Sequence, residues 1–436
     1  MTTPPAVVDR PTRMAPIAAA ATIATALEWF DFFIYTTAAS LVLGKLFFPT
    51  LGGVEGTLAS FATLAVGFIA RPIGGIVAGH LGDRWGRKPT LVLALVFMGV
   101  STFGIGLLPT YATAGALAPV LLILLRVVQG LGVGAQWGGA ALLLTEHAPV
   151  RKRGFYGSFV QVGAIGGSIL GNLVYLALTA WMADAAFESW GWRVPFLTGL
   201  VLIVIGVLLQ RRIEDTPVFQ KMRDEGAATP DVEKPPLIAA VRSHWRQILQ
   251  AAGAFMVVNT AYYIFISGIL SYGTGELKMA KSTILAIVLG AGATQLVTMP
   301  LMGWLSDRMS RRRLYLTGTV LLALWAFPLF LLVDTRSPLL IFVGLAVGFT
   351  FHSMMYGPQA ALYAEMFSAR VRYSGASLGY QIASIFAGGL APFVMTALLA
   401  ATGSSLSVSV YIFAMGVITF VAVFSIRESF QRDLYA

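Results

Sequence analysis

The sequence contains the stretch Gly79-His-Leu-Gly-Asp83-Arg84-Trp-Gly-Arg87-Lys88, which returns as Gly303-Trp-Leu-Ser-Asp307-Arg308-Met-Ser-Arg311-Arg312. The copies lie 224 residues apart (303 minus 79), about half of the 436-residue chain. Gly, Asp and Arg in this order are typical of a polar turn between two helices. The recurrence at half-length predicts two sequence-related halves, each with the turn at the same place.

The residues on either side of these turns are strongly apolar. Of the whole chain, 57% is hydrophobic and 11% charged, whereas about a quarter of a soluble domain is charged. About twelve apolar runs recur, each near the roughly 20 residues that cross a bilayer as a helix. They are too long for barrel strands and lack the alternation of such strands. We therefore predict an all-α membrane protein with twelve transmembrane helices in two six-helix bundles.

The runs and the polar segments between them predict the boundaries. The expected spans are 16–46, 55–81, 89–108, 117–146, 154–181, 193–210, 247–273, 282–305, 313–333, 338–366, 373–401 and 408–426. The predicted units are an N-terminal tail (1–15), a first bundle (16–210), a linker (211–246), a second bundle (247–427) and a C-terminal tail (428–436). No cleavage pattern follows the first run, so we expect it to remain as a helix.

Basic residues gather in alternate loops, which predicts the orientation. Clusters around Arg87, Arg151 and Arg311 and in the linker lie on one side, and few basic residues lie on the other. By the positive-inside rule, both termini and the linker are expected in the cytoplasm, in a bacterial-type inner membrane. The net charge of +10 is then explained by topology and contact with anionic lipids of the bilayer, and we expect no nucleic-acid partner.

The repeated stretch resembles the signature loop of the major facilitator superfamily. Further stretches resemble its metabolite:proton symporter family: Glu28-Trp-Phe-Asp31-Phe, Arg71-Pro-Ile-Gly-Gly, Arg126-Val-Val-Gln129-Gly130, Trp190-Gly-Trp-Arg193-Val-Pro-Phe, Tyr356-Gly-Pro-Gln-Ala-Ala and Val371-Arg-Tyr-Ser-Gly-Ala-Ser-Leu-Gly-Tyr-Gln381. That family includes bacterial transporters of shikimate, α-ketoglutarate and proline or betaine. The resemblance extends from about residue 20 to 427 and implies a solute site between the halves near mid-membrane. We expect a functional monomer.

The resemblance also implies that the repeated turns act as gates. In the superfamily, the Asp and Arg of this turn bridge the halves and latch one conformation. The residues expected to do so here are Asp83, Arg84, Arg87, Asp307 and Arg308, with the pairs Glu146–Arg153 and Glu365–Arg370 completing the latch. Because the first copy matches the pattern more fully, we expect the main latch in the N-terminal half. The alternative is a solvated turn that only sets topology.

Ionisable residues inside the apolar runs are the sharper signal, because such groups are costly at bilayer depth. Glu28 and Asp31 are three residues apart and share one helix face, and Arg71 and Arg126 lie within spans 2 and 4. Arginine keeps its charge whereas a carboxylate can be neutralised. We therefore predict that Asp31, with Glu28, accepts the coupling proton and that Arg126 is its partner or binds a substrate carboxylate. A permanently ionised structural network is the alternative, above all for Arg71.

Polar residues in other spans are candidates for the solute site. They are Tyr35, Arg71, Arg126, Gln136, Gln161, Asn259, Tyr262, Tyr263, Gln295, His352, Tyr356 and Gln381. Most suit hydrogen bonding to a hydroxylated solute, and helix packing is the alternative for each. Family members usually have Glu where this chain has Gln136. Either coupling rests on span 1 alone, or the ligand differs from the usual ones.

These patterns predict a proton-coupled symporter that takes up a small organic acid, such as a shikimate-like hydroxy acid or a dicarboxylate. Proton-coupled efflux on the same fold and a non-transporting sensor are the alternatives. An enzyme is not expected, because the chain has no cysteine, four histidines and no His-Glu-x-x-His. A Gly-x-x-x-x-Gly-Lys phosphate loop is also missing from the sequence. We expect no metal site and no cofactor besides the proton.

Overall fold

The computed structural model describes residues 14–85, 87–133, 141, 144–201, 204, 237–367, 372–427 and 430. Within these ranges, the side chains of residues 20, 78–92, 237–243 and 373–374 are not described. Every regular element in the described part of the chain is helical. The elements form two groups, one before and one after the predicted linker.

The first group is built from long apolar helices joined by short ones. Its elements are α1 (Met14–Ala38), η1 (Ala39–Leu43), α2 (Gly44–Phe47), α3 (Gly53–Trp85), α4 (Arg87–Leu107), α5 (Tyr111–Ala114), α6 (Leu117–Val133), η2 (Val150–Lys152), α8 (Arg153–Trp181), α9 (Asp184–Ser189), η3 (Gly191–Arg193) and α10 (Val194–Leu197). A π-helical turn, η1, interrupts the first span near its end. Such turns are frequent at functional sites.

The second group repeats this plan. Its elements are α13 (Leu237–Tyr263), η4 (Ile264–Gly268), α14 (Ile269–Gly275), α15 (Lys281–Ala293), α16 (Gln295–Arg308), α17 (Arg311–Asp334), α18 (Pro338–Met366), α19 (Arg372–Ala383), η5 (Ser384–Gly389), α20 (Ala391–Thr402) and α21 (Leu406–Ser425). The π-helical turn η4 lies in span 7, the repeat partner of span 1. A third, η5, lies in span 11.

The described helices account for the predicted spans. Nine have the length and apolar composition needed to cross a membrane, and residues 93–107 and 117–133 form shorter apolar helices. The remaining predicted span, 193–210, is described only as far as Val201 and at Val204. One boundary differs, because residues 237–246 of the predicted linker are already helical, with a bend at His244 (φ −122°, ψ 19°). Five apolar residues are followed by Arg242, His244 and Arg246, and these basic residues grouped the segment with the polar linker.

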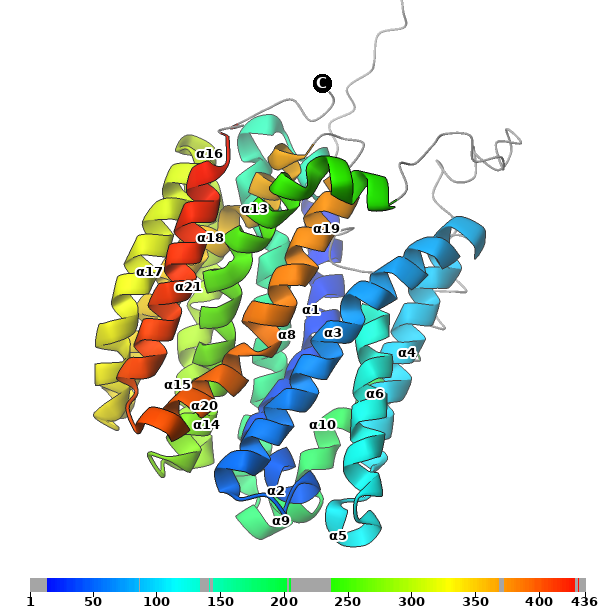
Figure 1. Cartoon of the computed structure of the whole chain (residues 1–436), viewed down its shortest axis with the longest axis vertical. Coiled ribbons are helices and arrows are strands. Elements are labelled where there is room, and N and C mark those ends of the chain that lie inside the picture. Colours follow the sequence, from blue (N-terminus) through cyan, green and yellow to red (C-terminus); the bar gives the residue numbers. More distant parts are fainter. Residues whose placement is uncertain are drawn as a thin grey trace, which may run out of the picture.

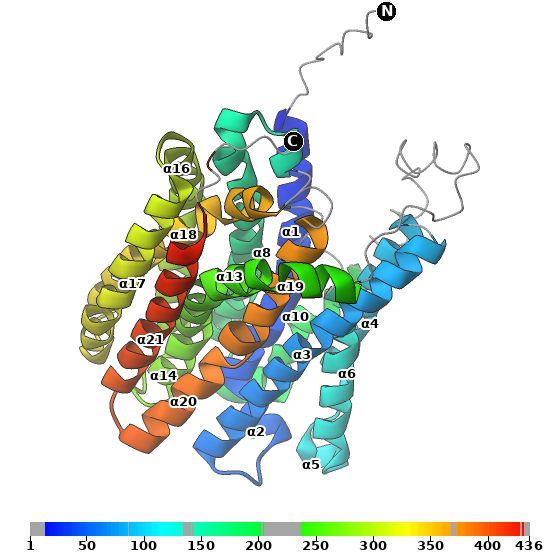
Figure 2. The same ribbon diagram turned by 45° about the horizontal axis from the view of Figure 1, so that its top comes forward.

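The two groups lie side by side and meet along several helix pairs (Figures 1 and 2). Helix α8 of the first half packs against α15, α16 and α18 of the second, and α3 packs against α19, η5 and α20. In addition, η1 contacts α14. The surface between the halves is therefore formed mainly by η1, α3 and α8 on one side and by α14, α15, α16, α18, α19, η5 and α20 on the other.

Helix direction defines two ends of the molecule. Helix α1 begins, and α21 ends, at the upper end in Figure 1, where α8 also begins and α16 ends. We call this the Asp307 end. The opposite end, with α2, α9 and the start of α15, is called the Lys281 end. The start of the first span and the end of the last one lie together, as an even number of crossings requires.

Candidate functional site

Four ionisable side chains are buried together in the first half. Asp31 and Glu28 lie on α1, Arg71 on α3 and Arg126 on α6, and none is more than 9% exposed. The three helices can approach closely because small residues lie where they cross. A Cβ atom added to Gly130 of α6 would lie 2.3 Å from the carbonyl oxygen of Gly67 in α3.

Asp31 and Arg126 are joined by a residue to which the sequence analysis assigned no role. The amide nitrogen of Gln129 donates to Oδ2 of Asp31 (2.9 Å) and to Oγ1 of Thr102 (2.8 Å). Its amide oxygen accepts a hydrogen bond from Nη1 of Arg126. The predicted partnership of Asp31 and Arg126 is therefore indirect within the described residues. The sequence did contain a signal for this role of Gln129, because its spacing of three residues from Arg126 places both side chains on one face of α6.

Arg71 is surrounded by aromatic rings. Its guanidinium carbon lies 4.2 Å from the ring centre of Phe68, 4.5 Å from that of Phe32 and 6.0 Å from that of Trp29. Among the described residues it makes these contacts rather than an ion pair with a carboxylate. Cation–π contacts of this kind stabilise an arginine whose charge is withdrawn from water.

A small cavity lies between the halves, close to this cluster. It is lined by Trp29, Ala164, Phe255, Val258, Asn259, Tyr262, His352 and Tyr356. Its volume is about 10 Å³, near the minimum for one water molecule. The amide nitrogen of Asn259 has no hydrogen-bond partner among the described residues. The cavity is too small for a solute in this conformation, but it marks a place where polar groups of the second half face the first.

The predicted solute residues divide into two groups in the structure. Asn259, Tyr262, His352 and Tyr356 line the cavity. Four residues that the sequence analysis did not select, Trp29, Ala164, Phe255 and Val258, line it as well. Phe255 lies one helical turn before Asn259, and this spacing could have identified it.

The other solute candidates lie around the cavity or elsewhere in the bundles. Gln295 contacts Nδ1 of His352 through its amide nitrogen (2.8 Å), so that a neutral ring carries its proton on Nε2. Tyr263 packs against Phe32 and Phe68 of the first half. Tyr35 bonds to Thr63 beneath Arg126. Gln161 and Gln381 are buried on α8 and α19, and Gln136 lies outside the described residues.

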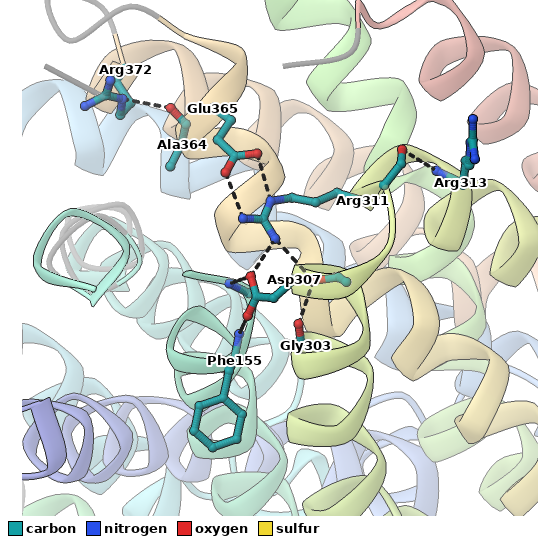
Figure 3. Close-up of polar contacts among 11 residues, drawn as sticks. Phe155, Gly303, Asp307, Arg311, Arg313, Ala364, Glu365 and Arg372 are labelled. Atoms are coloured by element: carbon teal, nitrogen blue, oxygen red, sulfur yellow. Dashed lines mark hydrogen bonds and ion pairs between the residues drawn. The ribbon is translucent and has the colours of Figure 1, made fainter. Parts of the chain in front are cut away.

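At the Asp307 end, a network of charges joins the halves (Figure 3). The carboxylate of Asp307 accepts hydrogen bonds from the backbone nitrogens of Gly154 and Phe155, each 2.8 Å long, in the first turn of α8. A carboxylate at a helix N-terminus satisfies free N–H groups and is favoured by the helix dipole. Arg311 donates to Asp307 at 2.9 Å and forms a fork of two bonds, 2.7 and 2.8 Å long, with Glu365.

The glycine that opens the second signature stretch allows this contact. A Cβ atom on Gly303 would lie 2.6 Å from the carbonyl oxygen of Gly154, and one on Gly154 would lie 2.4 Å from that of Gly303. Neither position can hold a side chain without moving α8 away from α16. The repeated sequence therefore supplies both the close approach and the carboxylate that caps α8.

Two carboxylates predicted to act in the gate have ion-pair partners in the described part of the chain. Glu365 pairs with Arg311; its predicted partner, Arg370, lies outside the described residues, so that pair stays a prediction. The described ion-pair partner of Glu146 is Arg372 (3.0 Å), which again joins the halves. Arg153 is buried near this network, and its charge acts on Glu365. Arg308 is not part of the network, because it is exposed and lies 3.9 Å over the ring of Trp304.

The prediction that the N-terminal copy holds the main latch stays a prediction. Asp83, Arg84 and Arg87 lie at the adjoining ends of α3 and α4, but their side chains are not described. In the described part of the chain, the C-terminal copy makes the contact between the halves. Arg311, which corresponds to Arg87 of the first copy, is the centre of this network.

The Lys281 end is closed by more exposed ion pairs. Lys281, at the start of α15, contacts Asp184 (3.0 Å) and Glu188 (3.3 Å) of α9, and Lys45 also contacts Glu188 (2.9 Å). Partial burial alone would raise the pKa of Glu188, but the hydrogen bonds and charges of Lys45 and Lys281 lower it overall. Glu188 therefore stays ionised, and these pairs persist, at neutral pH.

Deeper at this end, the π-helical turns of the two halves touch. The hydroxyl oxygens of Ser40 in η1 and Ser267 in η4 lie 2.6 Å apart. Both residues are buried. Repeat-related spans 1 and 7 thus meet at the point where each departs from regular α-helix.

Comparison with known families identifies the chain. The profile described as Major Facilitator Superfamily matches residues 21–388 and again residues 252–430. The chain belongs to the major facilitator superfamily. It is 38% identical to the shikimate transporter of Escherichia coli (strain K12) over 405 residues, 92% of each chain. It is 40% identical to the inner membrane metabolite transport protein YhjE of the same strain, over 95% of this chain and 94% of that protein.

Other relatives place it within the metabolite:proton symporter family of this superfamily. The proline/betaine transporter of Salmonella typhimurium is 34% identical over 95% of this chain and 84% of its own length. Among solved structures, a D-xylose-proton symporter has a TM-score of 0.75 at 18% identity and covers 96% of this chain and 99% of its own. The partially occluded inward open xylose transporter from E. coli has a TM-score of 0.69 at 18% identity over 94% and 98%.

These findings confirm the predicted major facilitator fold and a transporter rather than an enzyme. The chain is a multi-pass inner membrane protein. Its halves are in contact at both ends, so the cavity is enclosed between the Asp307 network and the Lys281 pairs. Exposed ion pairs such as those of Lys281 contribute about 0–1 kcal/mol each. At the Asp307 end, the two bonds from backbone nitrogens of α8 to the buried Asp307 carboxylate cross between the halves, and hydrogen bonds to charged groups contribute roughly 1.5–3 kcal/mol each. The transporter should therefore open more readily at the Lys281 end.

Substitution Asp307→Asn tests the closure of the Asp307 end. The amide keeps one acceptor but loses the ionic contact with Arg311 and one bond to α8, a loss on the order of 1–3 kcal/mol. Because the chain has no cysteine, a Ser158→Cys label site, facing Gly303 across the junction, reports opening directly. We expect Asp307→Asn to raise its maleimide labelling rate about tenfold.

The matched control is Arg308→Gln, next along the chain but outside the network, which should leave labelling unchanged. Equal labelling rates in Asp307→Asn and the parent protein would mean that Asp307 does not hold this end closed.

Proposed function

We propose that this transporter carries a small organic acid into the cell together with protons. The observation that carries the proposal is the buried cluster in which the Asp31 carboxyl reaches Arg126 through Gln129, with Arg71 nearby among aromatic rings. Two carboxyl groups that can be neutralised, those of Asp31 and Glu28, thus lie beside two arginines that keep their charge. This is the composition that a proton-coupled anion site requires.

Protonation of Asp31 is the step that links the proton to the solute. With Asp31 ionised, the positive charge of Arg126 is balanced within the bundle. With Asp31 neutral, the bundle holds an excess positive charge in a medium of low dielectric, where charge is costly unless it is paired. A solute carboxylate supplies the missing negative charge, so proton and anion are favoured together and neither is favoured alone.

Arg71 lies where it can meet such a carboxylate. Phe68, which packs on its guanidinium, contacts Tyr263 of the second half, and a Cβ atom on Gly389 of η5 would lie 2.8 Å from Phe68. Arg71 is therefore near the surface between the halves. A guanidinium offers two parallel donors to one carboxylate, which suits this role.

The uncharged part of the solute would face the second half. Asn259, Tyr262, His352 and Tyr356 present amide, hydroxyl and imidazole groups to the cavity, and these suit the hydroxyl groups of a shikimate-like acid. The similarity to a shikimate transporter supports the same class. The similarity to proline/betaine transporters makes a zwitterion the alternative solute.

The orientation that fits this function places the Asp307 end in the cytoplasm. Arg153, Arg311, Arg312, Arg313 and Arg372 lie at this end, and positive residues remain on the cytoplasmic side. Both tails and the linker would then be cytoplasmic. The protein would work as a monomer in the bilayer, with protons entering from the Lys281 end.

Transport by purified protein in liposomes tests the proposal. With the outside acidic, the protein should accumulate radiolabelled shikimate or another acid from a panel that also contains α-ketoglutarate, proline and betaine. A protonophore should abolish accumulation but not exchange. Accumulation driven only by the opposite pH gradient would instead show an antiporter, and gradient-independent equilibration would show that no proton is coupled.

A glycine on α3 provides a prediction about Arg126. A Cβ atom at Gly67 would lie 2.4 Å from Nη2 of Arg126, so Gly67→Ala should displace the guanidinium and reduce uptake at least about tenfold, in line with a lost charge-assisted contact. The measurement is the initial uptake rate in liposomes, with thermal unfolding recorded to confirm folding.

The matched control is Gly166→Ala on α8, where the added atom would meet only Ala26, 4.0 Å away. Uptake by this variant should stay near the parent rate. Full activity of folded Gly67→Ala would contradict the placement of Arg126 in the transport site.

A further inference from the structure

The amide of Gln129 lies between the guanidinium of Arg126, which only donates hydrogen bonds, and the ionised carboxylate of Asp31, which only accepts them. We propose that Gln129 is a positioning residue that makes the placement of Arg126 depend on the protonation state of Asp31. This inference rests on the proposed function for its role in transport, and on the hydrogen-bond geometry for the coupling itself.

The orientation of the amide follows from its neighbours. Arg126 has donors and no acceptor, and an ionised carboxylate has acceptors and no donor. The oxygen of Gln129 must therefore face Arg126, and its nitrogen must face Asp31, as found. Thr102 accepts the second N–H of the amide (2.8 Å). All the donors of this side chain are thus in use at a residue 1% exposed.

Apart from its hydrogen bond to Gln129, Arg126 makes only weak polar contacts. Its Nη2 reaches the carbonyl oxygen of Leu64 only at 3.5 Å, and its Nε has no hydrogen-bond partner among the described residues. Its guanidinium otherwise stacks on Tyr35, 3.8 Å from the ring centre. Because the stacked guanidinium can slide over the ring of Tyr35, the hydrogen bond to Gln129 is what fixes the direction in which the N–H groups of Arg126 point.

Protonation of Asp31 weakens that hold. Oδ1 of Asp31 has no hydrogen-bond partner among the described residues and can take the proton without breaking a bond. The Gln129 amide then donates to a neutral acceptor, a bond about half as strong as one to a charged acceptor. The amide becomes free to turn, and Arg126 becomes free to point its fork toward a solute carboxylate.

Other charged and titratable groups around this unit must be considered. They are Glu28 and Tyr35 on α1, Arg71 on α3, Arg126 on α6 and Tyr263 on α13. Helix α4 contributes the uncharged Thr102. The charge of Arg71 acts on Glu28 more strongly than the charge of Asp31 does. A variant at Gln129 should therefore act on Asp31 and leave the interaction of Glu28 with Arg71 unchanged.

Infrared titration of the purified protein tests the link between Gln129 and Asp31 without any solute. The carbonyl band of the protonated Asp31 carboxyl is identified by its loss in Asp31→Asn. Gln129→Leu removes a donor to the ionised form, so the pH midpoint of this band should rise by about one unit, a tenfold effect. The matched control, Gln359→Leu, replaces a buried glutamine of α18 and should leave the midpoint unchanged.

A second substitution separates the relay from simple attraction between charges. Arg126→Lys keeps the charge but loses the guanidinium that donates to Gln129. If Gln129 relays the coupling, Arg126→Lys raises the midpoint in the parent protein and adds nothing in the Gln129→Leu background. Equal shifts in both backgrounds, or no shift in Gln129→Leu, would overturn the proposal. Gln129→Asn, one carbon shorter, replaces Gln129→Leu if that variant does not fold.

Exchange of shikimate across liposomes tests the consequence for transport. The KM of the parent protein should rise with pH as Asp31 ionises, and that of Gln129→Leu should rise less steeply, because charge matching then acts without the relay. A parent protein that exchanges no member of the solute panel would count against the proposed function, whereas the infrared result would still decide the role of Gln129. A KM that depends on pH as steeply in Gln129→Leu as in the parent protein would overturn the relay.

Discussion

The need to match charge inside the membrane governs the first half of this transporter. Asp31, Glu28, Arg71 and Arg126 are all buried, and an unmatched charge at bilayer depth is costly. Their helices must therefore lie close enough for amide, aromatic and carboxyl groups to surround each arginine. The small residues of α3 and α6 make this possible, since a side chain at Gly74 would meet the backbone of Leu131 at 2.1 Å.

The same matching of charge, placed at the ends, decides how the halves close. At the Asp307 end, one carboxylate caps α8 and binds Arg311, and both groups are buried. At the Lys281 end, the pairs are more exposed and each is weaker. Alternating access requires that each end open in turn. The unequal strength of the ends predicts which one opens at smaller cost when the central site is empty.

Much of this could be predicted from the sequence, for physical reasons that also explain what was missed. A charged residue such as Asp31 is conspicuous in an apolar run, and the repeat at Gly79 and Gly303 predicts two halves. Gln129 is uncharged and therefore inconspicuous, although its spacing from Arg126 was visible. Pairing between helices depends on their relative rotation. Arg308 and Arg311 look equivalent in sequence, yet Arg308 ends α16 and Arg311 begins α17. The turn between the two helices leaves Arg308 exposed over Trp304 and Arg311 buried against Glu365.

Proton movement that accompanies solute entry tests the central claim most directly. Liposomes with a pH-sensitive dye inside, and no imposed gradient, would receive the solute that the transport panel identifies. The account predicts internal acidification in step with solute entry for the parent protein. For Asp31→Asn it predicts solute exchange without proton movement. Acidification at the parent ratio in Asp31→Asn would contradict the assignment of the coupling proton to Asp31.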